Sequence, residues 1–155
     1  MNIAKNHKST GRKEEKMQKT DFIKAKSTIA INTSKGVKAI QVYYNGTFEL
    51  MGNKLLKHYS KWQSTIKMMG LGTLVVLGDN LKAFGEDNKD GTLDLVAKGK
   101  EKEPCKVYED LARLIECETD SEFMYYWDKD RWYGMKIDDG KPYASGGLCE
   151  LTALV

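Results

Sequence analysis

The sequence predicts an α+β fold: a small antiparallel or mixed sheet with two to three helices packed on one face. Two strand-like hairpins, at residues 27–44 and 123–137, enclose segments whose apolar residues recur at helical spacing. The 155 residues, 41% hydrophobic and 30% charged, fit one globular domain that needs no metal or disulfide to hold its core.

The first predicted hairpin joins a β-branched strand at 27–33 to an alternating strand at 37–44. Gly36 supplies a positive φ at its turn, and Asn45-Gly46 is a strong turn signal at its end. The apolar residues of 51–59 then share one face of a helix. A second helix is expected from an N-cap at Ser60 to a stop at Gly70.

The second half is predicted from shorter signals. Residues 70–85 hold four glycines and are expected to be irregular around Leu74–Leu77, and 92–97 alternate like a strand. Pro104 is expected to open a helix whose apolar stripe runs to Ile115. Residues 123–127 and 132–137 form an aromatic hairpin, and 148–155 are compatible with strand or helix.

Charge divides the chain into a tail and a domain. Residues 1–26 hold eight Lys/Arg and three acidic residues, which predicts a basic, disordered tail that could contact nucleic acid. Residues 27–155, the predicted domain, hold seventeen basic and nineteen acidic residues, which disfavours a broad DNA-binding face. One hypothesis is that translation starts at Met17, because codons for 12–16 can read as a purine-rich ribosome-binding site.

The sequence favours the bacterial cytoplasm. It has no apolar run near the ~20 residues of a membrane span, and its N-terminus lacks the apolar core of a secretory signal. The three cysteines, Cys105, Cys117 and Cys149, form no CxxC pair and are expected to be reduced. We therefore expect no metal, no cofactor and no membrane partner.

Two loops resemble ligand-binding loops in part. Residues 86–94 place oxygen ligands like a calcium loop, but Ala97 stands where a bidentate Glu is needed. Gly70-Leu71-Gly72 lacks the third glycine of a dinucleotide fingerprint and any following GK[ST]. A polar turn and a tightly packed helix end explain these two loops more simply.

No catalytic set is evident. His58 stands at a predicted helix end without an HxxxH, HxE or GxSxG context, and Asp138-Asp139 precedes Gly140 as a turn. The expectation is a protein that is not an enzyme. The alternative is an unrecognised small enzyme built around His58, Asp79 and Asp138-Asp139.

The aromatic hairpin is the most unusual local feature. Tyr125, Tyr126, Trp127, Trp132 and Tyr133 fall within nine residues, beside Asp128. Neighbouring strand residues point to opposite faces, so we expect some of these rings to be exposed and to form a binding surface. The alternative is cross-strand pairing that stabilises the fold.

A set of motifs resembles a family of small, uncharacterised bacteriophage and prophage accessory proteins. The motifs are a STIAI hairpin from residue 27, a Tyr44-Asn45-Gly46 turn, LLKHY at 55–59, LGDNL at 77–81, and the WD…WY pair at 127–133. Tyr44-Asn45 stands where the family has Trp-Asp. The resemblance covers about residues 27–135 and adds Tyr44 and Asn45 to the candidate binding residues.

The resemblance implies a protein that binds and inhibits a host protein, such as a CRISPR–Cas or other immune effector. An acidic half supports this, because residues 101–139 hold twelve acidic and six basic groups that could compete for a basic nucleic-acid channel. The alternative is a nucleotide- or nucleic-acid-binding module that uses the aromatic hairpin and the basic tail.

Overall fold

The computed structural model describes residues 22–82, 91–138, 141–142 and 147–155. The predicted tail with Met17 (except for residues 22–26), residues 86–90 of the calcium-like loop, and Asp139 lie outside the described residues.

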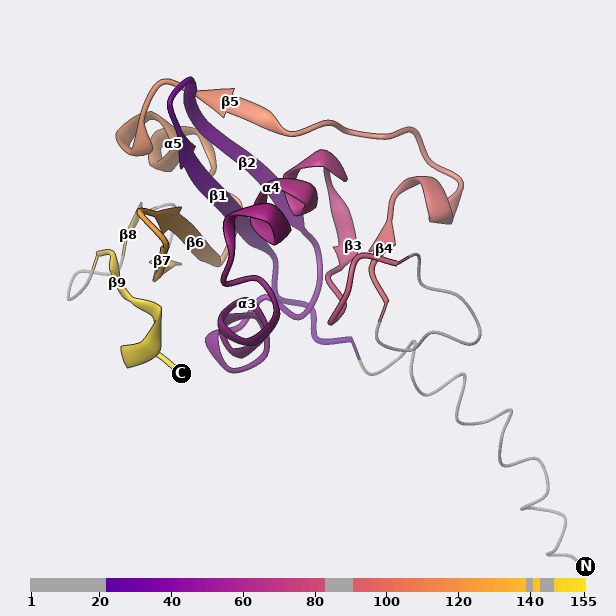
Figure 1. The fold of residues 1–155 in the computed structure, drawn as a ribbon, viewed down its shortest axis with the longest axis horizontal. Coiled ribbons are helices and arrows are strands. Elements are labelled where there is room, and N and C mark those ends of the chain that lie inside the picture. The colour runs from indigo at the N-terminus through magenta and orange to yellow at the C-terminus, as the bar shows by residue number, and fades with distance from the viewer. Residues whose placement is uncertain (1–21, 83–90, 139–140, 143–146) are drawn as a thin grey trace, which may run out of the picture.

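A mixed sheet forms the centre of the domain (Figure 1), as the sequence predicts. Its strands run in the order β4-β3-β2-β1-β6-β7-β8, while β5 also pairs with β2 and β9 with β7. The strands are β1 (Ser27–Thr33), β2 (Gly36–Val42), β3 (Leu74–Val76), β4 (Leu93–Asp94), β5 (Lys106–Tyr108), β6 (Phe123–Asp128), β7 (Arg131–Asp138), β8 (Lys141–Pro142) and β9 (Cys149–Glu150). Both predicted hairpins are present, and the strand β1 pairs parallel with β6, which joins them.

The helices are short, and side chains cap the N-termini of η1 and α5. They are the π-helix η1 (Phe48–Gly52), α3 (Asn53–His58), α4 (Trp62–Gly70), the 3-10 helix η2 (Val96–Lys98), α5 (Leu111–Cys117) and the 3-10 helix η3 (Leu151–Ala153). The Thr47 side chain accepts from the Leu50 amide, and Asp110 accepts from the Arg113 amide. The N-cap position of α4 is Lys61, one residue after the predicted Ser60, and its side chain makes no capping hydrogen bond; α4 ends at Gly70 as predicted.

Two apolar layers cover the sheet, one on each face. Along β1, Ile29 and Ile31 point into the core with α3 and α4, while Ala30 points into the core with α5. Figure 1 shows α4 crossing in front of β1 and β2. The α+β class is confirmed, but the helices occupy both faces, because α5 follows an edge strand that turns it onto the opposite face.

Three local predictions differ from the structure. The stretch at Leu74 is the buried strand β3 rather than irregular, and residues 92–97 give only the two-residue β4 followed by η2. Pro104 opens no helix: residues 106–108 pair with β2 as an edge strand, and α5 begins at Leu111 after the Asp110 cap. The C-terminal segment is strand β9 and then η3.

Candidate functional site

The aromatic hairpin lies in the core, which corrects the expectation of exposed rings. Tyr125, Tyr126, Trp127 and Trp132 are all buried, at 8% exposure or less. The rings do project to both faces, as strand geometry requires, with Tyr125 and Trp127 in one apolar layer and Tyr126 in the other. A sheet covered twice buries both sets, so these four residues offer no docking surface.

The buried rings of Tyr125, Trp127 and Trp132 connect the sheet to the apolar layer that contains α3 and α4. Trp127 and Trp132 pack edge-to-face with ring centroids 5.3 Å apart. The Trp132 indole donates to the Tyr59 carbonyl at 2.8 Å, and the Tyr125 hydroxyl donates to the Gly46 carbonyl at 2.6 Å. Burial raises the pKa of Tyr125 far above its usual value. Their role is cross-strand and interlayer packing, the alternative that the sequence left open.

The other two hairpin candidates, Tyr133 and Asp128, are half-buried near the β6–β7 turn. Asp128 accepts a hydrogen bond from the Asn32 amide group at 3.0 Å, which ties the hairpin tip to the end of β1. Tyr133 packs against the edge of the apolar layer that contains Tyr126.

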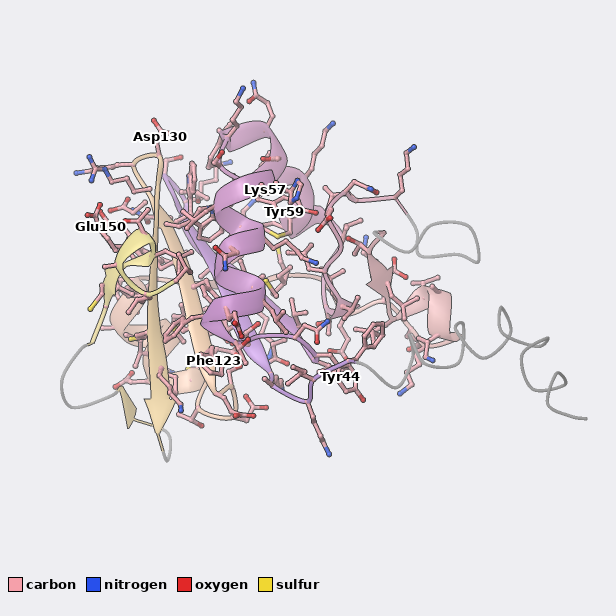
Figure 2. All side chains as sticks on the ribbon, turned by 90° about the horizontal axis from the view of Figure 1, so that it is seen from below. Tyr44, Lys57, Tyr59, Phe123, Asp130 and Glu150 are labelled. Carbon is pink, nitrogen blue, oxygen red and sulfur yellow. The ribbon has the colours of Figure 1, made fainter. Side chains whose placement is uncertain are left out.

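Tyr44 and Asn45 belong to a clamp on the segment that enters β1. The Asn45 side-chain oxygen accepts from the Ile23 backbone N–H at 2.7 Å, and the Asn45 backbone N–H donates to the Ile23 carbonyl at 2.7 Å. Asn45 has a positive φ of 61°, which Asn tolerates. Tyr44 stacks at a tilt with Phe22, 6.0 Å between ring centroids. Asn45 is therefore a structural residue. Figure 2 shows Tyr44 well separated from Lys57 of helix α3.

Two of the residues considered for a small enzyme, His58 and Asp79, lie near each other. Asp79 lies 3.4 Å from Lys54 Nζ and 3.7 Å from His58 Nε2, and Lys54 also donates to the Leu77 carbonyl at 3.0 Å. The histidine distance is beyond hydrogen-bond reach, so His58 is not aligned to exchange a proton with Asp79. These contacts attach α3 to the loop after β3 and form no nucleophile–base pair.

Tyr59 completes this attachment from the buried side. Its hydroxyl donates to the Gly78 carbonyl at 2.7 Å, and desolvation by burial raises the pKa of Tyr59 to about 12. A phenol with so high a pKa is a poor proton donor or nucleophile near neutral pH. Tyr59 therefore acts as a structural hydrogen-bond donor.

Backbone packing explains the glycine-rich turn after α4. Gly72, at φ +74°, packs so closely on the Glu103 carbonyl that a Cβ would lie 2.2 Å from its oxygen, which explains Gly70-Leu71-Gly72 as backbone packing. In the described ranges, no group of three His, Cys, Asp or Glu side chains is arranged to hold a metal ion.

A buried carboxylate holds α5 and β5 against β2. The side chain of Glu118 is 3% exposed and accepts from Gln41 Nε2 at 2.5 Å and from the Tyr108 hydroxyl. Lys106 Nζ lies 3.7 Å away and offsets its charge. Burial, and then the neighbouring Glu118, raise the pKa of Tyr108. This network fixes the position of the acidic helix described next.

The folded chain separates its charges between two surfaces. Residues 109–122 contain six acidic residues and one Arg, and five of the acidic residues are exposed. We name these five the acidic α5 surface: Glu109, Asp110, Glu116, Asp120 and Glu122. The helix α5 packs on one face of the sheet. Asp120 is bridged by Lys26 at 2.5 Å, which lowers its pKa, and Arg113 bridges Glu116 at 3.0 Å.

The opposite face carries a basic surface. Residues 50–78 contain four lysines and no acidic residue, and α3 and α4, within this range, pack on the other apolar layer. We name Lys57, Lys61, Lys67 and Trp62, all exposed, the basic α3–α4 surface. The sequence predictions missed these residues. The signal that could have found them is the run of 29 residues without Asp or Glu.

No family model, curated protein or solved structure matches this chain. Within the part of the chain that the structure describes, no helix combines the length and apolar character that a membrane crossing needs.

Proposed function

We propose that this chain is a non-catalytic accessory protein of the phage type that binds and blocks a host protein through its acidic α5 surface. The observation that carries the proposal is the concentration of five exposed carboxylates within the fourteen residues that contain α5, of which Asp120 is paired with Lys26 and Glu116 with Arg113. The resemblance to phage accessory proteins supplies the cellular setting and the class of target.

Charge complementarity gives the contact its physical basis. Proteins that handle nucleic acid carry clustered Lys and Arg, and an acidic surface competes for the same channel. Complementary charge accelerates encounter and excludes partners of like charge. A host-defence effector with such a channel, including a CRISPR–Cas nuclease, is the proposed target.

An apolar residue borders the acidic α5 surface. Val107 on the edge strand β5 is 57% exposed. It lies two residues before Glu109, in the strand that leads into α5. Its exposed side chain supplies contact area that carboxylates alone cannot, because charged residues contribute mainly specificity and association rate. The Glu118 network holds β5 and α5 in a fixed relation, so this surface is formed before binding.

The test is affinity purification of the tagged full chain from a bacterial host lysate, followed by mass spectrometry. The disruptive variant is Glu109→Lys/Glu116→Lys, which reverses two exposed charges of the acidic surface. The matched control is Glu49→Lys/Glu150→Lys, which makes the same change in net charge at exposed positions outside residues 109–122.

We expect the wild type and the control to recover one nucleic-acid-handling protein and to inhibit its activity, and the disruptive variant to lose both effects. Equal recovery by all three proteins would show that another surface makes the contact. Recovery of no protein partner, or of a partner whose activity is unchanged, would overturn the proposal.

A further inference from the structure

The basic α3–α4 surface presents a tryptophan that packing does not require. The inner side of α4 buries Thr65, Met68 and Met69, whereas Trp62 at its first position is 44% exposed. Trp127 and Trp132 are 2% and 4% exposed. An exposed indole leaves a large apolar area in water, which folding alone disfavours.

The charged residues nearest to Trp62 in the sequence are all basic. Lys57 and Lys61 precede it by five positions or fewer, and Lys67 lies on the solvent side of the same helix. The nearest acidic residue after this stretch, Asp79, is already engaged with Lys54 and His58. Among the residues that the structure describes, Lys57, Lys61 and Lys67 form no ion pair, so the surface combines an aromatic ring with unpaired positive charge.

We propose that this surface binds single-stranded nucleic acid, with the three lysines on phosphates and the Trp62 ring stacked on a base. Stacking platforms among basic residues are the usual means of binding single strands without sequence preference, because every base offers a π-face. This inference goes beyond the proposed function and is independent of it, because the acidic α5 surface lies on the other layer.

The chemistry favours a single strand over the other anionic partners. A duplex keeps its base faces stacked inside, so Trp62 would have no ring to cover. A protein partner would use Trp62 as an anchor, but lysine is depleted in the cores of protein interfaces. An exposed indole in a stretch with exposed lysines and no acidic residue therefore fits phosphate and base better than a protein surface.

The salt dependence follows from the number of lysines. Three phosphate contacts on a single strand give a slope of about −2.1 in log K against log salt, so affinity falls about 18-fold between 50 and 200 mM salt. Removing one stacked base costs about 5- to 150-fold in affinity.

The experiment measures binding of the full chain to a fluorescein-labelled single-stranded oligonucleotide by anisotropy across that salt range. Trp62→Ala removes the ring and keeps the charge, Trp62→Phe keeps a smaller ring, and Lys57→Glu/Lys61→Glu reverses two charges. The control Lys35→Glu/Arg113→Glu changes net charge equally at exposed positions on the β1–β2 turn and α5. Circular dichroism checks that each variant folds.

We expect Trp62→Ala to lose at least fivefold in affinity at unchanged salt slope, and Trp62→Phe to fall between it and the wild type. Lys57→Glu/Lys61→Glu should reduce the slope to about −0.7, while the control keeps the wild-type slope. Equal binding by all variants would assign binding to the N-terminal tail and overturn the proposal. Three other results would also overturn the proposal. The protein could bind double-stranded and single-stranded oligonucleotides with equal affinity, it could fail to bind the single strand, or polyglutamate could displace the labelled strand better than unlabelled single strand does.

Discussion

Replacing Tyr125 by Phe separates the two roles considered for the aromatic hairpin. The substitution removes one oxygen from a fully buried ring and leaves the net charge and the packed volume nearly unchanged. In the native protein that hydroxyl donates at 2.6 Å to the Gly46 carbonyl, at the turn that clamps the segment entering β1. The variant therefore leaves a carbonyl oxygen without this donor inside the fold.

The loss of stability in Tyr125→Phe depends on the cost of leaving the Gly46 carbonyl buried without a hydrogen-bond donor. A buried polar group left unsatisfied costs about 1–3 kcal/mol, whereas an average hydrogen bond contributes about 1 kcal/mol. For a domain of this size, each kcal/mol lowers the midpoint of thermal unfolding by about 3–5 °C. We expect the free energy of unfolding to fall by about 1–2 kcal/mol and the midpoint of thermal unfolding by about 3–10 °C.

The assay is urea unfolding and thermal melting followed by circular dichroism, alongside the two binding assays above. Tyr133→Phe is the matched control, because Tyr133 lies on the same hairpin but is only half-buried. We expect the control to change stability by less than about 0.5 kcal/mol. If Tyr125→Phe kept full stability but abolished binding, the hairpin would be a contact surface and the structural reading would be refuted.

Three further predictions concern the clamp, an ion pair and the buried carboxylate. Asn45→Ala should cost about 1–2 kcal/mol more than Asn45→Gly, because only glycine relieves the positive φ that Asn tolerates; equal losses in urea unfolding would contradict this. Lys26→Met should raise the pKa of Asp120 toward 3.8 in an NMR titration. Because the fold lowers the pKa of Asp120, the ion pair with Lys26 stabilises the folded protein above pH 3.8, and this stabilisation is lost as pH falls through the pKa of Asp120 in the folded protein. A pKa of Asp120 that is the same in Lys26→Met and in the wild type would exclude this ion pair. Glu118→Ala should cost about 2–4 kcal/mol by removing the acceptor of Tyr108 and Gln41, and a loss below 1 kcal/mol would show that the network is not structural.

The sequence predicts the two hairpins because their signals are local. The turn at Gly36, the end at Asn45-Gly46 and the aromatic run each specify structure within a few residues. β3 and β5 could not be predicted in the same way. A three-residue strand shows no period, and each exists because a distant strand pairs with it, as Val37 does with Tyr108.

The expectation of exposed rings on the aromatic hairpin was wrong for a related reason. The alternation of rings on β6 correctly predicts side chains on both faces of the strand. It does not reveal that α5 covers the second face, because that depends on Leu114 packing beside Met124. The basic surface, by contrast, is visible in the sequence as lysines without acids, and the position of Trp62 on the solvent side of α4 follows from the structure.

The parallel pairing of β1 with β6 has a consequence for how the chain folds during synthesis. Thr28 and Ser121, which share a buried hydrogen bond across this pair, are 93 positions apart. The β1–β2 hairpin leaves the ribosome early, yet one edge of β1 has no partner until β6 has been made. Throughout that interval the nascent chain exposes an apolar strand edge, which other chains can pair with. We therefore expect long-range closure to limit the folding rate of this domain, and truncated products that end before Phe123 to aggregate more readily than the full chain.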